Sequence, residues 1–337
     1  MDSVDLQVLK TAASWAQQGY RSTLATITRT WGSAPRPVGA MMLIRDDGMV
    51  VGSVSGGCIE DELIERVKSG KLGLVTPEVT SFGVSGDEAK RFGLPCGGRL
   101  QLVMEPVVPG GWIGGILGLL RRDSLVSRTL DVETGAVTMA AGGSHRAHCE
   151  FDGRTLSSTF GPRYRLLIIG AGQLSVYLAQ VAQGLDYQVI VCDPREEYSD
   201  AWALPDVELT REMPDDAVLA MRPDAHSAVV ALTHDPKLDD MALLEALKSP
   251  AFYVGALGSR ANNARRRERL QLFDLSRAQI DRLHGPIGLY IGSRTPPEIA
   301  ISILAQMTSV KNGVVSGAQR QGAMEPEAAS GVCPTLV

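Results

Sequence analysis

The segment Leu166-Leu167-Ile168-Ile169-Gly170-Ala171-Gly172 decides the fold of this chain. Its four apolar residues are typical of a buried strand, and an amphipathic helix that ends near Gly184 is predicted to follow the two glycines. A second apolar strand, over residues 188–192, is followed at once by Asp193. A dinucleotide-binding fold has this same order of elements: a strand, a G-x-G turn, a helix, a second strand and an acidic residue. We therefore expect a Rossmann-like domain in the C-terminal half.

Four residues of this segment are candidate contacts for a nucleotide. Gly170 and Gly172 would let a pyrophosphate approach the backbone at the helix N-terminus, where free N–H groups favour an anion. Asp193 stands where such folds bind a ribose hydroxyl, and Arg195 is close enough to meet a phosphate. The alternative for Arg195 is a surface salt bridge. Ser175 stands at the third glycine of the fingerprint, which mainly serves helix packing, and this weakens the match.

Further apolar strands over residues 228–233 and 252–254 alternate with helices, which predicts a doubly wound parallel sheet. Anion-friendly loops follow these strands or precede the last helix, which is expected to begin with a capping box at Thr295. Together they favour a large, multiply charged ligand. The candidate contacts in these loops are His234, Gly258, Ser259, Arg260 and Arg294. His234 would position the ligand or carry a proton, and the alternative is a loop histidine bonded to the backbone.

The N-terminal half has a different pattern, which predicts a compact α+β domain. Helices are expected over residues 5–18 and 59–68, and strands over residues 21–30, 39–45, 49–54 and 99–107. Residues 128–139 are typical of a hairpin, and residues 155–163 of an interdomain linker. The expected organisation is an α+β domain over 1–110, a connecting region and linker over 111–162, a Rossmann-like domain over 163–311 and a flexible tail over 312–337.

Two cysteines of this half lie in glycine-rich loops. Cys58 follows Gly52-Ser53-Val54-Ser55-Gly56-Gly57 at the expected start of a helix, and Cys96 lies within Leu94-Pro95-Cys96-Gly97-Gly98. A helix N-terminus favours a thiolate or an anion, so these loops suit an anionic, sulfur-linked ligand. The acids at positions 60–62 oppose thiolate formation, and the alternative for each cysteine is a small buried side chain. The candidate contacts are Ser55, Gly56, Gly57, Cys58, Cys96 and Gly97.

The composition excludes several classes of function. The chain has 337 residues, which is typical of two domains, with a net charge of −5 and five scattered cysteines. An acidic chain offers no electrostatic footprint for nucleic acid, and an odd number of cysteines is no disulfide framework. The apolar run over residues 112–120 is about half of a membrane span, and no signal peptide is recognised, so a cytoplasmic protein is expected. The arginines between positions 265 and 269 are interpreted as a solvated helix face.

Taken together, these residues resemble the xanthine dehydrogenase accessory protein family, also called the XdhC/CoxI family. The resemblance is most specific in GSVSGGC, YVGALGSR and GPIGLYIGSRTPPEIA. The chain departs from the family pattern at Gln173, where histidine is frequent, and at Ser175. The matching stretches, in order, are residues 52–60, 94–98, 167–172, 193–195, 233–236, 253–260 and 285–303.

The resemblance implies an accessory chaperone rather than an enzyme. Members of the family bind molybdenum cofactor, as molybdopterin or its cytosine dinucleotide form, protect it and promote its sulfuration with a cysteine desulfurase. They then deliver it to the large subunit of a molybdenum hydroxylase of the xanthine or aldehyde dehydrogenase type. For this chain, the resemblance implies that the candidate residues bind the cofactor, with Cys58 and Cys96 as candidate contacts to molybdenum. A homodimer is also expected.

Two other functions stay open on the residues alone. Residues 170–193 also fit an NAD-dependent oxidoreductase, although beyond His234 no acid or base for hydride transfer stands out. NAD is therefore the less expected cofactor. A persulfide-carrying sulfurtransferase would instead use Cys58 or Cys96 as its sulfur carrier.

Overall fold

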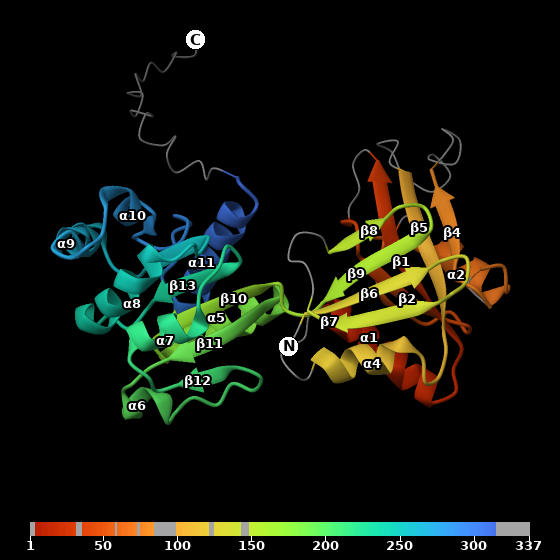
Figure 1. Cartoon of the computed structure of the whole chain (residues 1–337), viewed down its shortest axis with the longest axis horizontal. Helices are drawn as coiled ribbons and strands as arrows, with labels where there is room; N and C mark the ends of the chain where they lie inside the picture. Colours follow the sequence, from red (N-terminus) through yellow and green to blue (C-terminus); the bar gives the residue numbers. More distant parts are fainter. Residues whose placement is uncertain are drawn as a thin grey trace, which may run out of the picture. The chain divides into compact units, whose positions relative to one another are not determined.

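The computed structural model of the chain describes residues 4–31, 36–57, 59–72, 75–83, 99–120, 125–142 and 148–314 (Figure 1). The chain divides into two units. The first contains residues 1–165 and 182–189, and the second contains residues 166–181 and 190–337. Within the described residues, no helix combines the length and the apolar character that crossing a membrane requires.

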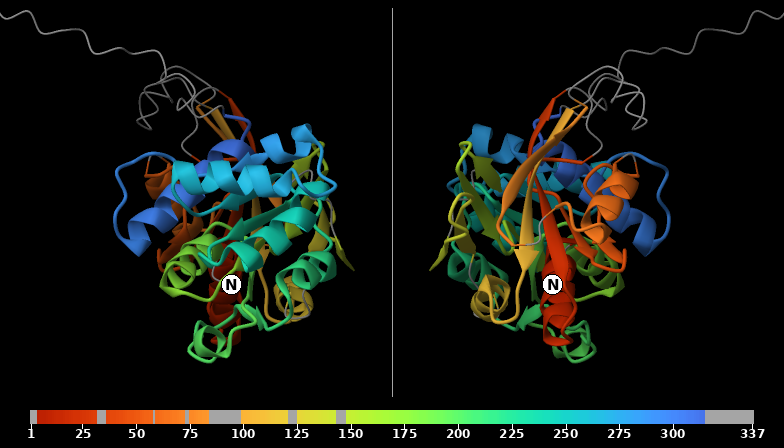
Figure 2. Two further views of the ribbon diagram at one scale, coloured as in Figure 1. Left: turned by 90° about the vertical axis from the view of Figure 1, so that its left-hand side faces the viewer. Right: turned by 90° about the vertical axis from the view of Figure 1, so that its right-hand side faces the viewer.

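The first unit is built from two antiparallel sheets and three helices among its described residues. Its elements are α1 (Val4–Gln17), β1 (Ser22–Trp31), β2 (Met41–Arg45), β3 (Val50–Gly52), α2 (Glu60–Lys68), β4 (Glu78–Phe82), β5 (Arg99–Val107), α4 (Trp112–Leu120), β6 (Val126–Asp131), β7 (Val137–Ala141), β8 (Cys149–Phe151) and β9 (Thr155–Phe160). The larger sheet has the strand order β3-β2-β1-β5-β4, and the smaller one has the order β7-β6-β9-β8. The long strands β1 and β5 run side by side, with a register shift after Ile27 (Figure 2).

Strand β2 explains how the larger sheet buries both of its faces. Met42 and Ile44 pack in one apolar core with Leu63 of α2. Met41 and Leu43 pack in another core, which contains residues of α1 and α4. Because successive side chains of a strand point to opposite faces, a short apolar run contributes to both cores. The α+β fold predicted for this half is confirmed.

One expectation for this half is wrong. Residues 155–160 form β9, which pairs with β6 and β8, and they are not part of an interdomain linker. The segment contains four hydroxyl residues among its six, so its sequence resembles a loop, yet Leu156 is fully buried in a core with Val103 of β5 and Leu130 of β6. The hairpin predicted over residues 128–139 is confirmed by the antiparallel pairing of β6 with β7.

The second unit is a parallel sheet with helices between its strands. Its elements are β10 (Tyr164–Ile169), α5 (Gln173–Gly184), β11 (Tyr187–Cys192), α6 (Glu196–Ser199), β12 (Glu208–Thr210), α7 (Pro214–Met221), β13 (Ser227–Ala231), α8 (Pro236–Lys248), β14 (Tyr253–Ala256), α9 (Arg260–Leu270), α10 (Arg277–Asp281), β15 (Leu283–His284) and α11 (Pro296–Lys311). The strand order is β12-β11-β10-β13-β14-β15. In chain order this is third, second, first, fourth, fifth and sixth, the order of a Rossmann fold. The predicted doubly wound sheet is confirmed.

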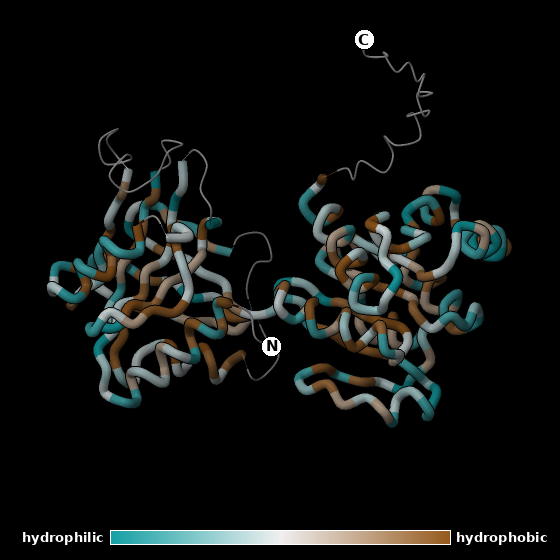
Figure 3. The backbone as a smooth tube through the Cα atoms, turned by 180° about the vertical axis from the view of Figure 1, so that it is seen from behind, coloured by the Kyte–Doolittle hydropathy of each residue, from teal (hydrophilic) through white to brown (hydrophobic). Residues whose placement is uncertain are grey.

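The strands of this sheet are almost wholly apolar because both faces are covered. Leu167 and Ile169 of β10 pack in one core with residues of α7 and α8. Leu166 and Ile168, which alternate with them along the strand, face the other side. Figure 3 shows hydrophobic residues along the strands and hydrophilic ones on the outer turns of the helices. The capping box predicted at the start of α11 is confirmed, since Glu298 accepts a hydrogen bond from the N–H of Thr295.

Candidate functional site

The polar loops that follow β10, β11, β13 and β14 form the candidate site, and we call them the carboxyl-edge loops. They lie at the switch point of the sheet, where β10 and β13 are neighbours. The backbones of Gly170 and Thr233 touch there, because a Cβ on Gly170 would lie 3.1 Å from the Thr233 nitrogen. Gly170 also has a φ of +108°, which residues with a side chain rarely adopt. By contrast, a Cβ on Gly172 would meet nothing within 4 Å, so space beside this residue is open.

Asp193, after β11, is fully buried, and its carboxylate accepts four hydrogen bonds. Oδ2 accepts from the N–H of Ala171 and from Nη2 of Arg195, each at 2.8 Å. Oδ1 accepts from the N–H of Arg195 at 3.1 Å and from its Nε at 2.9 Å. A carboxylate offers about four acceptor positions, so this arrangement leaves none for a ribose hydroxyl. The salt bridge considered for Arg195 is present, and its partner is this buried acid.

This ion pair holds a cation in a fixed orientation. Burial raises the pKa of Asp193, but hydrogen bonds from Arg195 and Ala171 outweigh it and keep the pKa below its usual range. The hydrogen bond to Asp193 in turn raises the pKa of Arg195. The guanidinium lies 4.0 Å from the ring centroid of Tyr198, and 24% of the Arg195 side chain stays exposed. Both groups are therefore charged at neutral pH, and the cation reaches the surface.

The loop after β13 is held by its own side chains. Thr233 donates from its N–H and its hydroxyl to Oδ1 of Asp239, at 3.1 and 2.7 Å. Asp235 caps α8 by accepting from the N–H of Lys237 at 2.8 Å. His234 is exposed and has a φ of +63°. Its ring makes no hydrogen bond with the part of the chain that the structure describes, so the loop presents this side chain without fixing it.

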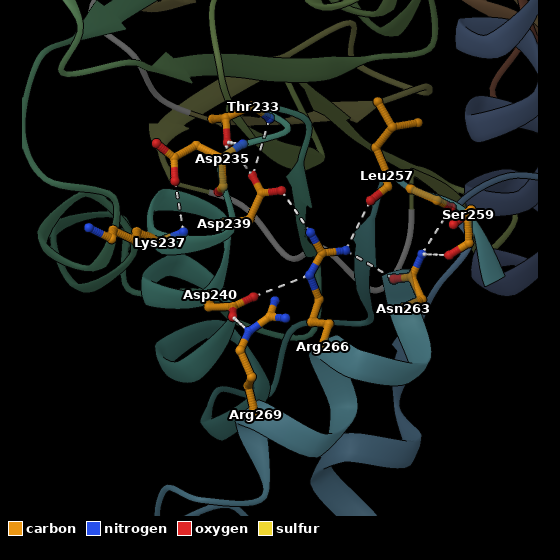
Figure 4. Close-up of polar contacts among 11 residues, drawn as sticks. Thr233, Asp235, Lys237, Asp239, Asp240, Leu257, Ser259, Asn263, Arg266 and Arg269 are labelled. Atoms are coloured by element: carbon orange, nitrogen blue, oxygen red, sulfur yellow. Dashed lines mark hydrogen bonds and ion pairs between the residues drawn. The ribbon is translucent and has the colours of Figure 1, made fainter. Parts of the chain in front are cut away.

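A buried arginine of α9 ties this loop to the next one (Figure 4). Arg266 donates from Nη2 to Oδ2 of Asp239 at 2.8 Å and from Nε to Oδ1 of Asp240 at 3.2 Å. Its Nη1 donates to the carbonyl of Leu257 at 2.9 Å and to Oδ1 of Asn263 at 3.0 Å. Asp239 is fully buried and Arg266 is 5% exposed. The loops after β13 and β14 are therefore braced by one internal ion pair.

Asn263 extends this network to the loop before α9 and to the one after β15. Its Nδ2 donates to the carbonyls of Gly258 and Ser259, at 3.0 and 3.2 Å. A Cβ on Gly285 would lie 2.3 Å from Oδ1 of Asn263, so the backbone there approaches closely. Arg260 is exposed at the start of α9. The network supports these loops from inside and leaves the outward-facing groups available.

The solvated helix face expected between positions 265 and 269 is wrong for Arg266. Arg267 is half-buried and donates to the carbonyls of Leu283 and Gly285, at 2.8 and 3.1 Å. Arg269 donates to Oδ2 of Asp240 at 2.6 Å. The physical reason is that α9 lies against α8 and β15, which supply acids and carbonyls that the sequence cannot place.

Most of the candidate contacts predicted in this half lie in the carboxyl-edge loops. These are Gly170, Gly172, Asp193, Arg195, His234, Gly258, Ser259 and Arg260. Arg294 is separate, because it precedes α11 and its N–H donates to Oε2 of Glu298 at 2.7 Å. Sequence reasoning missed Asp239, Arg266 and Asn263, and no local motif signals them.

The glycine loop of the first unit closes on the carboxylate of Glu60. Five backbone N–H groups donate to it between 2.8 and 3.2 Å, and two hydroxyls donate to it as well. The donors are the N–H groups of Val54, Ser55, Gly56, Gly57 and Ile59 and the hydroxyls of Ser53 and Ser55. Sequence reasoning missed this role, and its signal is an acid in the first helical turn next to a loop of small residues.

The anion position of this loop is thus filled by the protein itself. Burial raises the pKa of Glu60, but hydrogen bonds from Ser55 and Ser53 outweigh it and lower the pKa to about 2. The N–H groups of Gly56 and Gly57, which were candidate ligand contacts, already bind this carboxylate. Three other candidates lie outside the described residues, namely Cys58, Cys96 and Gly97.

The described cysteines are poor nucleophiles. Burial raises the pKa of the Cys149 thiol to about 11 and that of the Cys192 thiol to about 12. Both are therefore protonated at neutral pH, as expected for structural cysteines. Among the residues whose placement is described, no group of three His, Cys, Asp or Glu side chains is arranged to hold a metal ion.

Comparison with known families finds two matches along the chain. Residues 166–307 match the model of the XdhC Rossmann domain, and residues 15–72 match that of the XdhC and CoxI family. The first match contains all the carboxyl-edge loops, and the second contains the loop that closes on Glu60.

Three individual proteins are similar over nearly their whole length. The molybdenum cofactor insertion chaperone PaoD of Escherichia coli is 26% identical over 90% of this chain and 88% of its own. A probable xanthine dehydrogenase subunit of Bacillus subtilis is 25% identical over 87% of this chain and 94% of its own. The crystal structure of a xanthine dehydrogenase from Bacillus halodurans superposes with a TM-score of 0.69 at 26% identity, and covers 94% of this chain and 98% of that one.

Proposed function

Because the chain belongs to the XdhC and CoxI family, we propose that it is a chaperone for molybdenum cofactor. The cofactor is its cargo: the protein binds it, protects it, supports its sulfuration and passes it to a molybdenum enzyme. The name of PaoD and the near full-length similarity to it support this function. The cofactor carries a terminal phosphate, and this is the group that we expect the carboxyl-edge loops to bind.

One observation carries the proposal: these loops are braced from inside while their anion-binding groups face outward. The N-terminus of α5, where a helix favours an anion, follows the glycine loop, and space beside Gly172 is open. Arg195 supplies a fixed cation next to them. Such a site suits a phosphorylated ligand that is held and released.

The finer parts of the proposal concern partners. We expect a cysteine desulfurase to supply sulfur and the large subunit of a molybdenum hydroxylase, of the xanthine or aldehyde dehydrogenase type, to receive the cargo. Cys58 and Cys96 are the candidate contacts to molybdenum, and molybdopterin and its cytosine dinucleotide form are the candidate ligands. We also expect a homodimer that works in the cytoplasm.

The alternative functions make different demands on the same residues. An NAD-dependent oxidoreductase of this fold reads the ribose with an open acid, whereas all acceptor positions of Asp193 are filled. A persulfide-carrying sulfurtransferase would place labelled sulfur on Cys58, and full function of a Cys58→Ala variant would exclude it. The chaperone is therefore the function that these observations support best.

The test is retention of isolated molybdenum cofactor by the purified full chain, read as fluorescent oxidised pterin, with NAD as the parallel ligand. We expect stoichiometric retention that falls in Cys58→Ala and stays unchanged in Cys333→Ala, a control thiol outside the glycine loops. Gly172→Val should also lose retention, because its side chain would fill the open space.

Each outcome has a distinct meaning. Binding of NAD without retention of pterin would contradict the chaperone and favour the oxidoreductase. Retention that is equal in Cys58→Ala and wild type would leave the chaperone standing but remove Cys58 from the binding site. Equal loss in both cysteine variants would assign the effect to general loss of thiols.

A further inference from the structure

We propose that Arg195 is the specificity residue of the carboxyl-edge loops, and that it selects a ligand with a phosphate ester where other nucleotide-binding folds select a ribose diol. The inference rests on the proposed function, since it concerns the cargo of the same loops. Asp193 is then a positioning residue, which acts through Arg195 and does not touch the ligand.

The first step concerns the hydrogen bonds that the carboxylate of Asp193 already accepts. A carboxylate that reads a ribose must offer free acceptor positions to the two hydroxyls. Both oxygens of Asp193 already accept two hydrogen bonds each, and the residue is fully buried. A ribose hydroxyl would have to displace the guanidinium of Arg195 and leave a buried charge without its partner, which is strongly unfavourable.

The second step concerns the hydrogen-bond donors that Arg195 still has available. A guanidinium has five N–H donors in one plane, and two of those of Arg195 bind Asp193. The other three make no hydrogen bond with any described residue. Contact with the Tyr198 ring and the two-point bond to Asp193 keep the plane from turning. The protein thus presents a fixed set of donors, which matches the acceptor oxygens of a phosphate.

The third step concerns the position of Arg195 relative to the glycine loop before α5. Nη2 of Arg195 and the N–H of Ala171 donate to the same oxygen of Asp193, so the guanidinium lies beside the glycine loop. The loop N-terminal to α5 is where a nucleotide places its phosphates. The cation and the loop therefore meet one anionic ligand from two sides.

The experiment uses NAD⁺ and NADP⁺ as probes, because they differ only in the 2′-phosphate of one ribose. Dissociation constants are measured by titration calorimetry with the full chain. We expect NADP⁺ to bind wild type about tenfold more tightly than NAD⁺, as one charged hydrogen-bonding pair provides. In Arg195→Ala the preference for NADP⁺ should be lost or reversed, because the freed carboxylate of Asp193 can accept from a ribose hydroxyl and repels a phosphate. Arg195→Lys should keep a smaller preference, because lysine retains the charge but not the planar fork.

The matched control is Arg211→Ala, which removes an exposed arginine paired with Asp200 in the same unit. It changes the net charge equally and should leave the NADP⁺ preference unchanged. The ratio of the two constants is the readout, since a purely structural defect would weaken both nucleotides alike. If thermal unfolding shows that Arg195→Ala does not fold, the ratio in Arg195→Lys decides, and a value equal to that of wild type contradicts the proposal.

Three results would overturn the inference: equal constants in wild type, a preference that persists in Arg195→Ala, or no measurable binding of NADP⁺. Pterin retention is measured on the same variants. Retention by wild type without an NADP⁺ preference would refute this inference and leave the chaperone intact. A clear NADP⁺ preference without pterin retention would refute the proposed function and leave the role of Arg195 intact.

Discussion

Among the glycine-containing loops that precede helices, residues 53–57 before α2 and residues 170–172 before α5 treat the helix N-terminus in opposite ways. In the first loop, Glu60 from the helix itself collects five backbone N–H groups. In the second, Asp193 from a neighbouring strand collects one loop N–H, and the space beside Gly172 stays open. Glycine spacing therefore does not say whether a loop binds an external anion. The position of the nearest acid decides whether the N–H groups of the loop are already occupied.

The largest effect is expected from removing Arg266, which braces the loops after β13 and β14. Arg266→Ala would leave the buried Asp239 without its partner, and we expect the free energy of unfolding of the second unit to fall by about 3–5 kcal/mol. Arg265→Ala removes an exposed arginine of the same helix and should change it by less than about 0.5 kcal/mol. Urea unfolding measures both. A loss below about 1 kcal/mol for Arg266→Ala would show that the loops do not depend on this ion pair.

The first loop is tested by neutralising its internal anion. In Glu60→Gln an amide nitrogen would face N–H donors, and we expect a loss of about 2–3 kcal/mol in the free energy of unfolding of the first unit. Asp61→Asn, at the next and exposed position, is the matched control and should stay within about 0.5 kcal/mol of wild type. Equal effects of the two substitutions would mean that Glu60 contributes only its charge near the helix N-terminus.

A third test separates the two glycines of the second loop. Gly170→Ala combines a positive φ with a Cβ close to Thr233, and it should cost about 2 kcal/mol of unfolding free energy. Gly172→Ala has neither problem and should change the stability by less than about 0.5 kcal/mol. Thermal unfolding of the two variants gives the comparison. If both lose stability equally, the close approach of Gly170 to Thr233 is not what requires glycine.

The smallest effect is expected from pH. The pKa of Glu60 in the folded chain is about 2, below its usual value of 4.5, so its charged form contributes stability fully above pH 4.5 and loses it as the pH falls towards 2. The stability difference between wild type and Glu60→Gln should therefore shrink over this range. Urea midpoints at pH 6, 4 and 3 measure it. A difference that stays constant would contradict the role of the charge.

The sequence predicted the sheet of the second unit because its signal is local. Apolar strands, the G-x-G turn and the acid after β11 follow one another closely, and the capping box at Thr295 is contained in four residues. The ion pair between Arg266 and Asp239 was not predictable in this way. Arg266 is 26 or 27 positions from the acids it binds, and nothing in the arginine-rich stretch distinguishes it from the exposed Arg265.

The candidate site shows the same limit. The glycine loops were found from spacing, but the groups that fill their donors were not. Whether Asp193 faces a ligand or Arg195 depends on side-chain directions that only the folded backbone sets. Strand β9 was not predicted for a different reason: its hydroxyl-rich sequence lacks the apolar alternation that is typical of a half-buried strand.

The single arginine that reaches Asp239, Asp240, Leu257 and Asn263 also restricts how this protein can be recombined with its relatives. A chimera that exchanges α8 would replace the acids that Arg266 binds, and one that exchanges α9 would leave the native acids without their arginine. Segments on the two sides of this contact should therefore be inherited as a block. Substitutions within the block should show epistasis, although they lie in separate stretches of the chain.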